Sequence, residues 1–441
     1  MLTFLNEIHF FTLYFSEFVH TWEFYMFFVP IVLFVEFPLY FLVLMGMLKI
    51  LTNNIFNPEF TPNYHPKVSC IVTCYNEGDS VIRTIKSLLH QIYYGIIEVI
   101  VVIDGADINI ETLKAASNYK RKFSIPVDRI LKILPKSSRG GHASSENLGV
   151  KMAEGDIVII LDGDCSCDNN MVEAVVQNFK NKNVAGVSGS IKVRNYKCNL
   201  LTRLQALEYI IGLHLSRIGL GNIGMLNNIS GAFGIFRKDI IEAVGGWKNG
   251  TAEDLDLTMR LKAYEKRYKG FKLVHDHTAI VHTDVPETWK GYFKQRLRWE
   301  GDLYYVYFRR HLKSTLPKYM GWKNIFGIYW YNIFFCAAVP LITAGYMIFL
   351  LFEFNISFVV ALLLITYFYY LIVTSFMFII YILLACDRKK SDIKLALIIP
   401  IMPLYQFVGR LWTAFSLLAE IFLKTHKNSN MAPWWVIKKT L

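Results

Sequence analysis

Long apolar runs stand near both ends of this sequence and enclose a more polar middle section. Residues 24–50, 325–351 and 356–385 are each long enough to cross a bilayer as a helix, which takes about 20 apolar residues. Glu36 and Pro38 interrupt the first run, so a kink is expected there. These three runs argue against a soluble protein.

A fourth apolar run, 395–423, is less regular. Pro400 and Pro403 break it and Arg410 lies inside it. Two interpretations fit this run: a kinked third C-terminal span, which we favour, or a short re-entrant or interfacial pair. Lys49 ends the first run and a basic section follows, so the excess of positive charge predicts a cytoplasmic middle section.

The middle section alternates between short apolar runs and helical patterns. The expected strands are 68–74, 97–103, 129–134, 157–161, 184–193, 230–237, 271–275 and 278–282, and the expected helices are 79–92, 109–121, 143–153, 168–180, 238–244, 253–265 and 287–311. This alternation predicts an α/β fold with a parallel sheet and helices on both faces. Ligands of such sheets bind at the carboxyl ends of the strands.

These patterns divide the chain into successive sections. We expect an N-terminal segment with one span (1–50), a linker (51–66), a cytoplasmic α/β domain (67–285), an interfacial amphipathic region (286–322), C-terminal spans (323–424) and a basic tail (425–441). An alternative places an additional span at residues 5–20, which would return the N-terminus to the inside.

Composition agrees with a membrane protein that meets anionic partners. The 441 residues are 54% hydrophobic and carry a formal net charge of +12. No nucleic-acid-binding signature accompanies this charge, so anionic lipid or an anionic substrate is the better interpretation. Seven scattered cysteines without framework spacing predict reduced thiols in a cytosol-facing domain.

Carboxylates follow the most apolar of the predicted strands. Asp162 and Asp164 share one strand-end turn. Mg²⁺ and Mn²⁺ take one or two carboxylates together with substrate phosphates, so this turn suits a metal ion that bridges a diphosphate. A solvated turn is the plainer interpretation of an isolated D-x-D motif.

Three further groups carry candidate chemistry. Glu253 and Asp254 open a predicted helix, where they serve either as N-terminal capping charges or, for Asp254, as a general base. The loop 136–142 contains Arg139 and a Gly pair, which suits phosphate recognition or a flexible basic loop. Tyr75 ends the first strand, where it could stack on a nucleobase or simply be a strand-end aromatic residue.

Residues 295–299 read QRLRW. A basic amphipathic helix on the membrane surface accounts for this segment taken alone. With the upstream carboxylates, Arg296 and Arg298 instead suit the charge of a departing diphosphate, and the Trp299 indole suits a sugar face.

In this order, the motifs resemble those of the membrane-embedded family 2 glycosyltransferases, which include poly-N-acetylglucosamine, hyaluronan, chitin and cellulose synthases. The resemblance covers residues 67–311 and rests on Tyr75-Asn76-Glu77, Asp104-Gly105, Asp162-Gly163-Asp164, Glu253-Asp254 and the QRLRW segment. The approach to that segment, residues 285–288, looks most like poly-β-1,6-N-acetylglucosamine synthases. The resemblance implies a GT-A-type, Rossmann-like glycosyltransferase domain inserted between transmembrane helices.

The resemblance also implies roles for individual residues. Tyr75, Glu77 and Asp104 would hold the uridine, Asp162 the ribose or phosphates, and Asp164 the metal, with Asp162 beside it. Asp254 would be the base, next to Glu253. Gln295, Arg298 and Trp299 would close over the diphosphate and the acceptor sugar. The implied reaction is an inverting, metal-dependent transfer with one base and no covalent intermediate.

The sequence departs from the family pattern at several positions. His142 stands where the family often has Lys, so a phosphate contact is either lost or made by Arg139. Ala252 replaces a common Thr, and Glu300-Gly301-Asp302 replaces Ala-Gln-Gly after the Trp. These departures put the identity of the sugar in doubt.

The expected activity is transfer from a UDP-sugar to a growing polysaccharide at the inner face of the cell membrane, with coupled export. The expected partners are the UDP-sugar, the glycan acceptor, membrane lipid, Mg²⁺ or Mn²⁺ and a possible small membrane accessory subunit, and not nucleic acid. Two rival hypotheses are a transferase that adds one sugar to a lipid acceptor and a non-catalytic export subunit.

Overall fold

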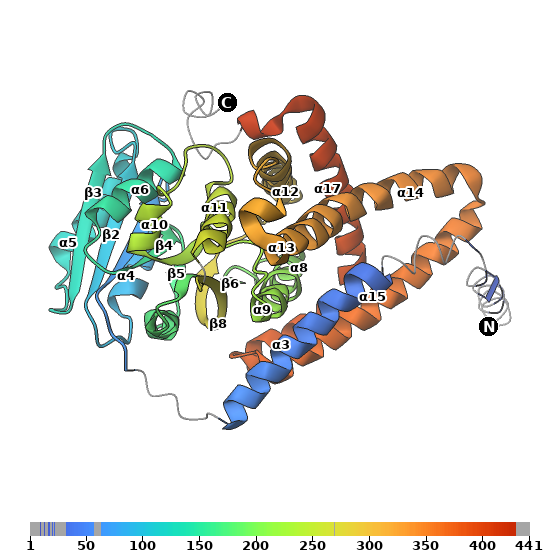
Figure 1. Ribbon diagram of the computed structural model, residues 1–441, viewed down its shortest axis with the longest axis horizontal. Coiled ribbons are helices and arrows are strands. Elements are labelled where there is room, and N and C mark those ends of the chain that lie inside the picture. Colours follow the sequence, from blue (N-terminus) through green and yellow to red (C-terminus); the bar gives the residue numbers. More distant parts are fainter. Residues whose placement is uncertain are drawn as a thin grey trace.

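The computed structural model describes residues 32–56, 63–268 and 270–428, together with isolated positions before residue 32. The predicted span residues 24–31 and the tail from residue 429 lie outside the described part, as do most of residues 1–20 and linker residues 57–62. The described chain combines an α/β domain with a set of long apolar helices (Figure 1).

Within the described residues, eight strands form one mixed sheet in the order β3-β2-β1-β4-β7-β6-β8-β5. Their bounds are β1 Val68–Cys74, β2 Ile97–Asp104, β3 Arg129–Lys136, β4 Ile157–Asp162, β5 Ser166–Cys167, β6 Val184–Val193, β7 Phe233–Arg237 and β8 Lys272–Thr283. The α/β fold class predicted from the sequence is therefore confirmed.

The sheet is not wholly parallel, which corrects one expectation. Strands β1 to β4 run parallel, but β7 is antiparallel to both β4 and β6, and β5 is antiparallel to β8. A buried central strand has the same apolar character in either direction, so composition could not reveal this reversal. The two strands expected in 271–282 form one strand with irregular register, and the two-residue β5 was not predicted.

Helices cover both faces of the sheet because alternate strand residues point to opposite sides. Val99 and Val101 of β2 join one apolar core together with α4 (Ser80–Leu89) and α5 (Ile110–Lys122). Ile100 and Val102 join a second core with α6 (His142–Met152), α10 (Lys238–Ala243) and α11 (Glu253–Arg267).

Segments between the strands and the apolar helices complete the domain. They are α7 Met171–Val176, the helical stretch α8 Leu200–Glu208, η4 Tyr209–Leu215 and α9 Ser216–Asn222, and α12 Trp289–Tyr304 with a π-helical continuation η5 Tyr305–Arg310. The expected helix 287–311 thus ends as a regular α-helix at Tyr304. All seven cysteines are free thiols, as the sequence predicted.

Four described helical segments are long and apolar enough to cross a membrane: Val32–Thr52, Pro317–Glu353, Ile356–Leu384 and Lys389–Leu423. They contain η2 Val32–Glu36 and α3 Phe37–Phe56, then α13 Pro317–Gly327, η6 Ile328–Ala338 and α14 Val339–Glu353, then α15 Ile356–Leu384, and last α16 Lys389–Asp392, η7 Ile393–Ile401 and α17 Met402–Leu423. In the last segment the chain changes from a 3₁₀-helix to an α-helix between Pro400 and Pro403, where the sequence predicted an interruption.

Candidate active site

Strands β1, β2 and β4 run parallel, so their carboxyl ends meet at one edge of the sheet. Asp104 ends β2 and is almost fully buried there. Its carboxylate accepts hydrogen bonds from the backbone N–H groups of Gly140 and Gly141, both at 2.9 Å, and pairs with Lys136 Nζ at 2.7 Å. Asp104 therefore shapes the loop that leads into α6, and its contact with uridine stays a prediction.

Tyr75 and Arg139 lie face to face at the same edge. The Arg139 guanidinium carbon is 3.9 Å from the centre of the Tyr75 ring, which is a cation–π contact. Tyr75 is 41% exposed, so one side of this pair remains open to solvent. The two residues that the sequence assigned to a base and a phosphate are thus brought together.

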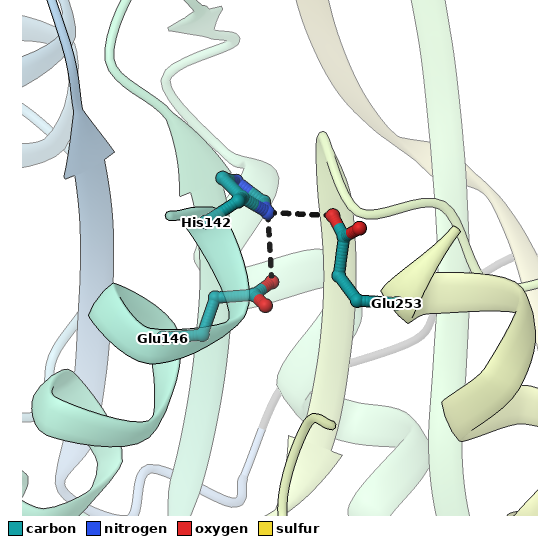
Figure 2. Close-up of side chains that lie close together, drawn as sticks. All are labelled: His142, Glu146 and Glu253. Carbon is teal, nitrogen blue, oxygen red and sulfur yellow. Dashed lines mark hydrogen bonds and ion pairs between the residues drawn. The ribbon is translucent and has the colours of Figure 1, made fainter. Parts of the chain in front are cut away.

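His142, the first residue of α6, connects three strand and helix ends. Its Nδ1 lies 2.7 Å from Glu253 Oε1 and 3.6 Å from Glu146 Oε1 (Figure 2). Its Nε2 lies 3.1 Å from Asp162 Oδ1 and 2.9 Å from the Thr73 hydroxyl. Burial opposes the charged imidazole, but the surrounding carboxylates raise the pKa of His142 well above its usual value.

Asp254, in the first turn of α11, is held by three donors. Its Oδ2 accepts from Asn228 Nδ2 at 3.1 Å and from the Gly231 N–H at 3.0 Å, and its Oδ1 accepts from the Leu255 N–H at 2.7 Å. Burial and then the charge of Glu253 raise the pKa of Asp254, whereas the contact with His142 outweighs burial and lowers the pKa of Glu253. The two adjacent carboxyls are therefore driven toward different protonation states.

The backbone just before α11 is unusual. Ala252 has φ 52° and ψ 44°, a left-handed conformation that residues other than Gly, Asn and Asp rarely adopt. This turn directs Glu253 and Asp254 toward the carboxyl edge of the sheet. Backbone strain of this kind tends to collect at functional sites.

The Asp162 and Asp164 turn has the composition of a divalent-metal site. Burial and the nearby Asp162 raise the pKa of Asp164 to about 6. Burial also raises the pKa of Glu77 to about 7, and both aspartates add to that shift. A Cβ at Gly163 would lie 2.8 Å from Cys74 Sγ and 3.0 Å from the Glu77 side chain, so a larger residue would displace its neighbours in this turn. Three carboxylates crowded at one turn fit a hard cation with oxygen ligands.

The QRLRW segment lies on α12, whose two arginines have different surroundings. Arg296 Nη2 is 2.8 Å from Glu208 Oε2, and its guanidinium lies 4.8 Å from the Trp299 ring centre. These contacts give Arg296 a partner inside the protein, and its contact with a diphosphate stays a prediction. Arg298 is partly exposed and is among the charges that lower the pKa of Glu253. The Gln295 Oε1 atom is buried without a hydrogen-bond partner among the described residues.

Several residues of this site were not identified from the sequence. Asn228 and Glu146 carry no motif, although Glu146 stands four residues after His142 on α6, a spacing that places both on one helix face. Asp302 belongs to the departure after Trp299 and accepts a hydrogen bond from the Thr251 hydroxyl. The departure from the family pattern after Trp299 was the signal available in the sequence. A buried acid one helical turn after the motif requires a hydrogen-bond partner.

Comparisons with known proteins agree with this geometry. Residues 69–244 match Glycosyl transferase family 2, and residues 157–386, just over half of the chain, match Glycosyl transferase family group 2. The chain belongs to the family 2 glycosyltransferases. The family resemblance seen in the sequence is thereby confirmed.

Curated relatives within this family are named for one product. Poly-beta-1,6-N-acetyl-D-glucosamine synthase of Staphylococcus epidermidis is 27% identical over 61% of this chain and 63% of its own length. The protein of the same name from Staphylococcus aureus strain MSSA476 is 28% identical over 55% of this chain and 56% of its own length. The alignment therefore spans less than two thirds of either relative.

A solved structure shares the fold of this family 2 member. The mannosyltransferase PcManGT from Pyrobaculum calidifontis, in complex with GDP-Man and Mn²⁺, superposes with a TM-score of 0.57 at 16% sequence identity. The superposition covers 88% of this chain and 99% of the other. It therefore extends the fold agreement to the combined catalytic domain and apolar helices.

Proposed function

We propose that this protein transfers a sugar from a UDP-sugar to a growing polysaccharide at the cytoplasmic face of the cell membrane and passes the product through its own helices. A β-linked N-acetylglucosamine polymer is the product class that the names of the curated relatives support. The protein would be a multi-pass membrane protein with its catalytic domain in the cytoplasm, divided into the sections expected from the sequence.

The arrangement of Asp254 carries this proposal. A general base must present a fixed carboxylate oxygen to the hydroxyl of the acceptor. Asn228, Gly231 and Leu255 fix that carboxylate, and burial keeps its proton affinity above that of an ordinary aspartate. A single base beside a nucleotide edge suits an inverting displacement, in which the acceptor oxygen attacks the anomeric carbon and the nucleoside diphosphate leaves.

Other residues would position the donor and the leaving group. Tyr75 and Arg139 offer an aromatic and a cationic surface for the nucleotide, with Asp104 and Glu77 beside them. His142 and Glu253 would orient the donor sugar and its phosphates. Asp162 and Asp164 would hold Mg²⁺ or Mn²⁺, which when bound neutralises charge on the diphosphate.

The α12 segment would supply the remaining side of the site. Arg298 would stabilise negative charge that develops on the departing diphosphate. Trp299 would stack on the acceptor sugar, with Gln295 as a polar neighbour on the same helix. Because α12 packs against α17, a polymer leaving Trp299 would lie close to the apolar helices.

The test is a reaction with the purified full chain in lipid nanodiscs and a panel of UDP-sugars, followed by product sizing and linkage analysis. We expect a polymer from one UDP-sugar, and excess chelator should abolish its formation. Asp254→Asn should lose transfer by at least about 10²-fold while UDP affinity stays within twofold. Asp239→Asn, an exposed aspartate at the start of α10, is the matched control and should keep full activity.

Other outcomes would contradict the proposal in identifiable ways. A product with a single added sugar on lipid would support the lipid-acceptor hypothesis instead. Absence of transfer with every donor, despite measured UDP binding, would support a non-catalytic export subunit. Full turnover by Asp254→Asn would remove Asp254 from the role of base.

A further inference from the structure

Glu146 is a buried carboxylate whose one ion pair, with His142 Nδ1, is long at 3.6 Å. Its side chain is fully buried in α6, and neither carboxylate oxygen has a hydrogen-bond donor among the described residues. An ionised carboxylate in this position has a large desolvation cost unless a cation or donor compensates it. Both oxygens lie on the side of α6 that carries His142 and that faces Glu253 (Figure 2).

The contacts of His142 indicate which of its ring nitrogens carries a proton and which one faces Glu146. The Nε2 atom faces Asp162 Oδ1 and the Thr73 hydroxyl, which assigns the ring proton to Nε2 if the ring is neutral. The Nδ1 atom then presents a lone pair to Glu253 and Glu146. Three lone pairs facing one another are mutually repulsive, so either a proton, on Nδ1 or on Glu146, or a metal ion must lie among them.

Two occupants are chemically possible, a proton and a metal ion. A proton on Nδ1 satisfies Glu253 at 2.7 Å but leaves Glu146, at 3.6 Å, without a hydrogen bond. A metal ion would be coordinated by all three side chains at once. The three candidate ligand atoms lie within 4.8 Å of one another, a compact set that small side-chain rotations would close around one ion.

We propose that His142 Nδ1, Glu146 and Glu253 form a site for a divalent transition-metal ion of the Mn²⁺ or Zn²⁺ class. An imidazole nitrogen with two carboxylates favours such ions over Mg²⁺, which prefers an all-oxygen shell. Asp162 would act as the outer partner of the histidine, because a metal-bound imidazole usually donates its second N–H to a carboxylate. This role uses Asp162 Oδ1 and leaves its other oxygen for the ion expected at Asp164.

Gly231 is the neighbour of this cluster on the Asp254 side, and a Cβ there would lie 3.6 Å from Glu253 Oε1 and 3.7 Å from the His142 ring. A bound ion would join the start of α6 to the start of α11, beside Asp254. It would thereby fix the backbone that positions the base. Metal binding here does not depend on the transfer reaction.

The experiment is metal stoichiometry of the purified full chain without nucleotide. The protein would be dialysed against Mn²⁺ or Zn²⁺ and its metal content measured by mass spectrometry. We expect two equivalents in the wild type, one in Glu146→Gln and one in Asp164→Asn. Glu111→Gln, an exposed glutamate in the first turn of α5, is the matched control and should keep two.

A second measurement uses the wild type alone, so it does not depend on whether a variant folds. Pulsed electron paramagnetic resonance of bound Mn²⁺ detects a coordinated imidazole nitrogen, whereas the ion expected at Asp162 and Asp164 has only oxygen ligands from the protein. A histidine nitrogen signal that is lost in Glu146→Gln supports the site. A wild type with one equivalent and no nitrogen signal would overturn it and leave a proton between these side chains. Transfer activity is measured separately, so failure here leaves the proposed reaction standing.

Discussion

Arg410 on α17 forms an ion pair with Glu36 at the start of the first apolar helix, with 3.1 Å between Nη2 and Oε1. Glu36 is fully buried, and the hydroxyls of Tyr369 and Tyr370 on α15 donate to it at 3.1 and 2.5 Å. The pair therefore connects three candidate membrane segments through one carboxylate. Each charge taken alone looked like an interruption of its apolar run.

Breaking this pair should destabilise the helix assembly. Arg410→Met leaves the Glu36 charge buried with only its tyrosine donors, and we expect a loss of about 3–5 kcal/mol in unfolding free energy. Thermal unfolding in detergent would measure it. The double variant Glu36→Gln with Arg410→Met should recover part of the loss. Arg83→Gln removes an exposed pair at 3.9 Å and should change stability by less than about 1 kcal/mol. Equal losses in Arg410→Met and Arg83→Gln would contradict the interpretation.

Asp104→Asn should weaken nucleotide binding through the loop that it organises. The amide has one acceptor oxygen where the carboxylate has two, and it loses the ion pair with Lys136. We expect a loss of about 1.5–3 kcal/mol in the stability of this region and a weaker Kd for UDP, measured by calorimetry. Asp107→Asn is an exposed control in the same stretch of chain. An unchanged Kd for UDP would show that the loop does not contribute to the site.

The two arginines of α12 should respond differently to the same substitution. Arg296→Gln removes the contact with Glu208 and the cation–π contact with Trp299, so stability should fall by about 1–3 kcal/mol. Arg298→Gln should leave stability nearly unchanged but lower kcat by about 10²–10³-fold, because it removes charge stabilisation of the leaving group. Unfolding curves and steady-state kinetics of the two variants separate these effects. If both variants lose kcat equally with no change in stability, Arg296 also contacts the diphosphate.

Asp302 should make stability dependent on pH. Burial raises the pKa of Asp302 to about 7, from 3.8 in an exposed aspartate. Between these values the folded state holds a proton that the unfolded state has released, so the contribution of Asp302 to stability falls as pH rises through this window. Asp302→Asn keeps an acceptor for Thr251 and removes the ionisation. Its stability relative to wild type should therefore rise from pH 4 to 7, by up to about 4 kcal/mol, and stay level above that. A difference that does not change with pH would show that Asp302 ionises normally.

Much of the catalytic domain could be predicted because its signals are local. Strands β1, β2, β4 and β6 are mostly apolar and almost wholly buried, and polar residues stand at or directly after the ends of the first three of them. The edge of the sheet where the carboxyl ends of these strands meet could therefore be predicted from the pattern of apolar and polar residues alone. The direction of β7 could not be predicted, because an apolar strand between two others is compatible with either orientation. The two-residue β5 is too short to give any period.

The candidate site also divides into residues that have a local signal in the sequence and residues that have none. Asp162, Asp164 and Asp254 were identified because each follows a strand or opens a helix. Glu146 and Asn228 were missed because their roles arise only where segments distant in sequence meet. The contact of Arg296 with Glu208 was also missed, because Glu208 lies 88 residues away and belongs to no motif. Pairings across such distances are set by tertiary packing.

The attachment of α12 has a consequence for how the enzyme can be divided. This helix packs along α17, and the Trp412 indole N–H on α17 donates to the Phe293 carbonyl at 3.0 Å (Figure 1). Helix α11, which carries Asp254, packs against α13 at the beginning of the next apolar segment. Two helices of the candidate site, α11 and α12, thus pack against segments that are long and apolar enough to cross a membrane. A fragment ending before residue 317 would retain every motif residue yet lack these packing partners, so we expect the working unit of this enzyme to include its apolar helices.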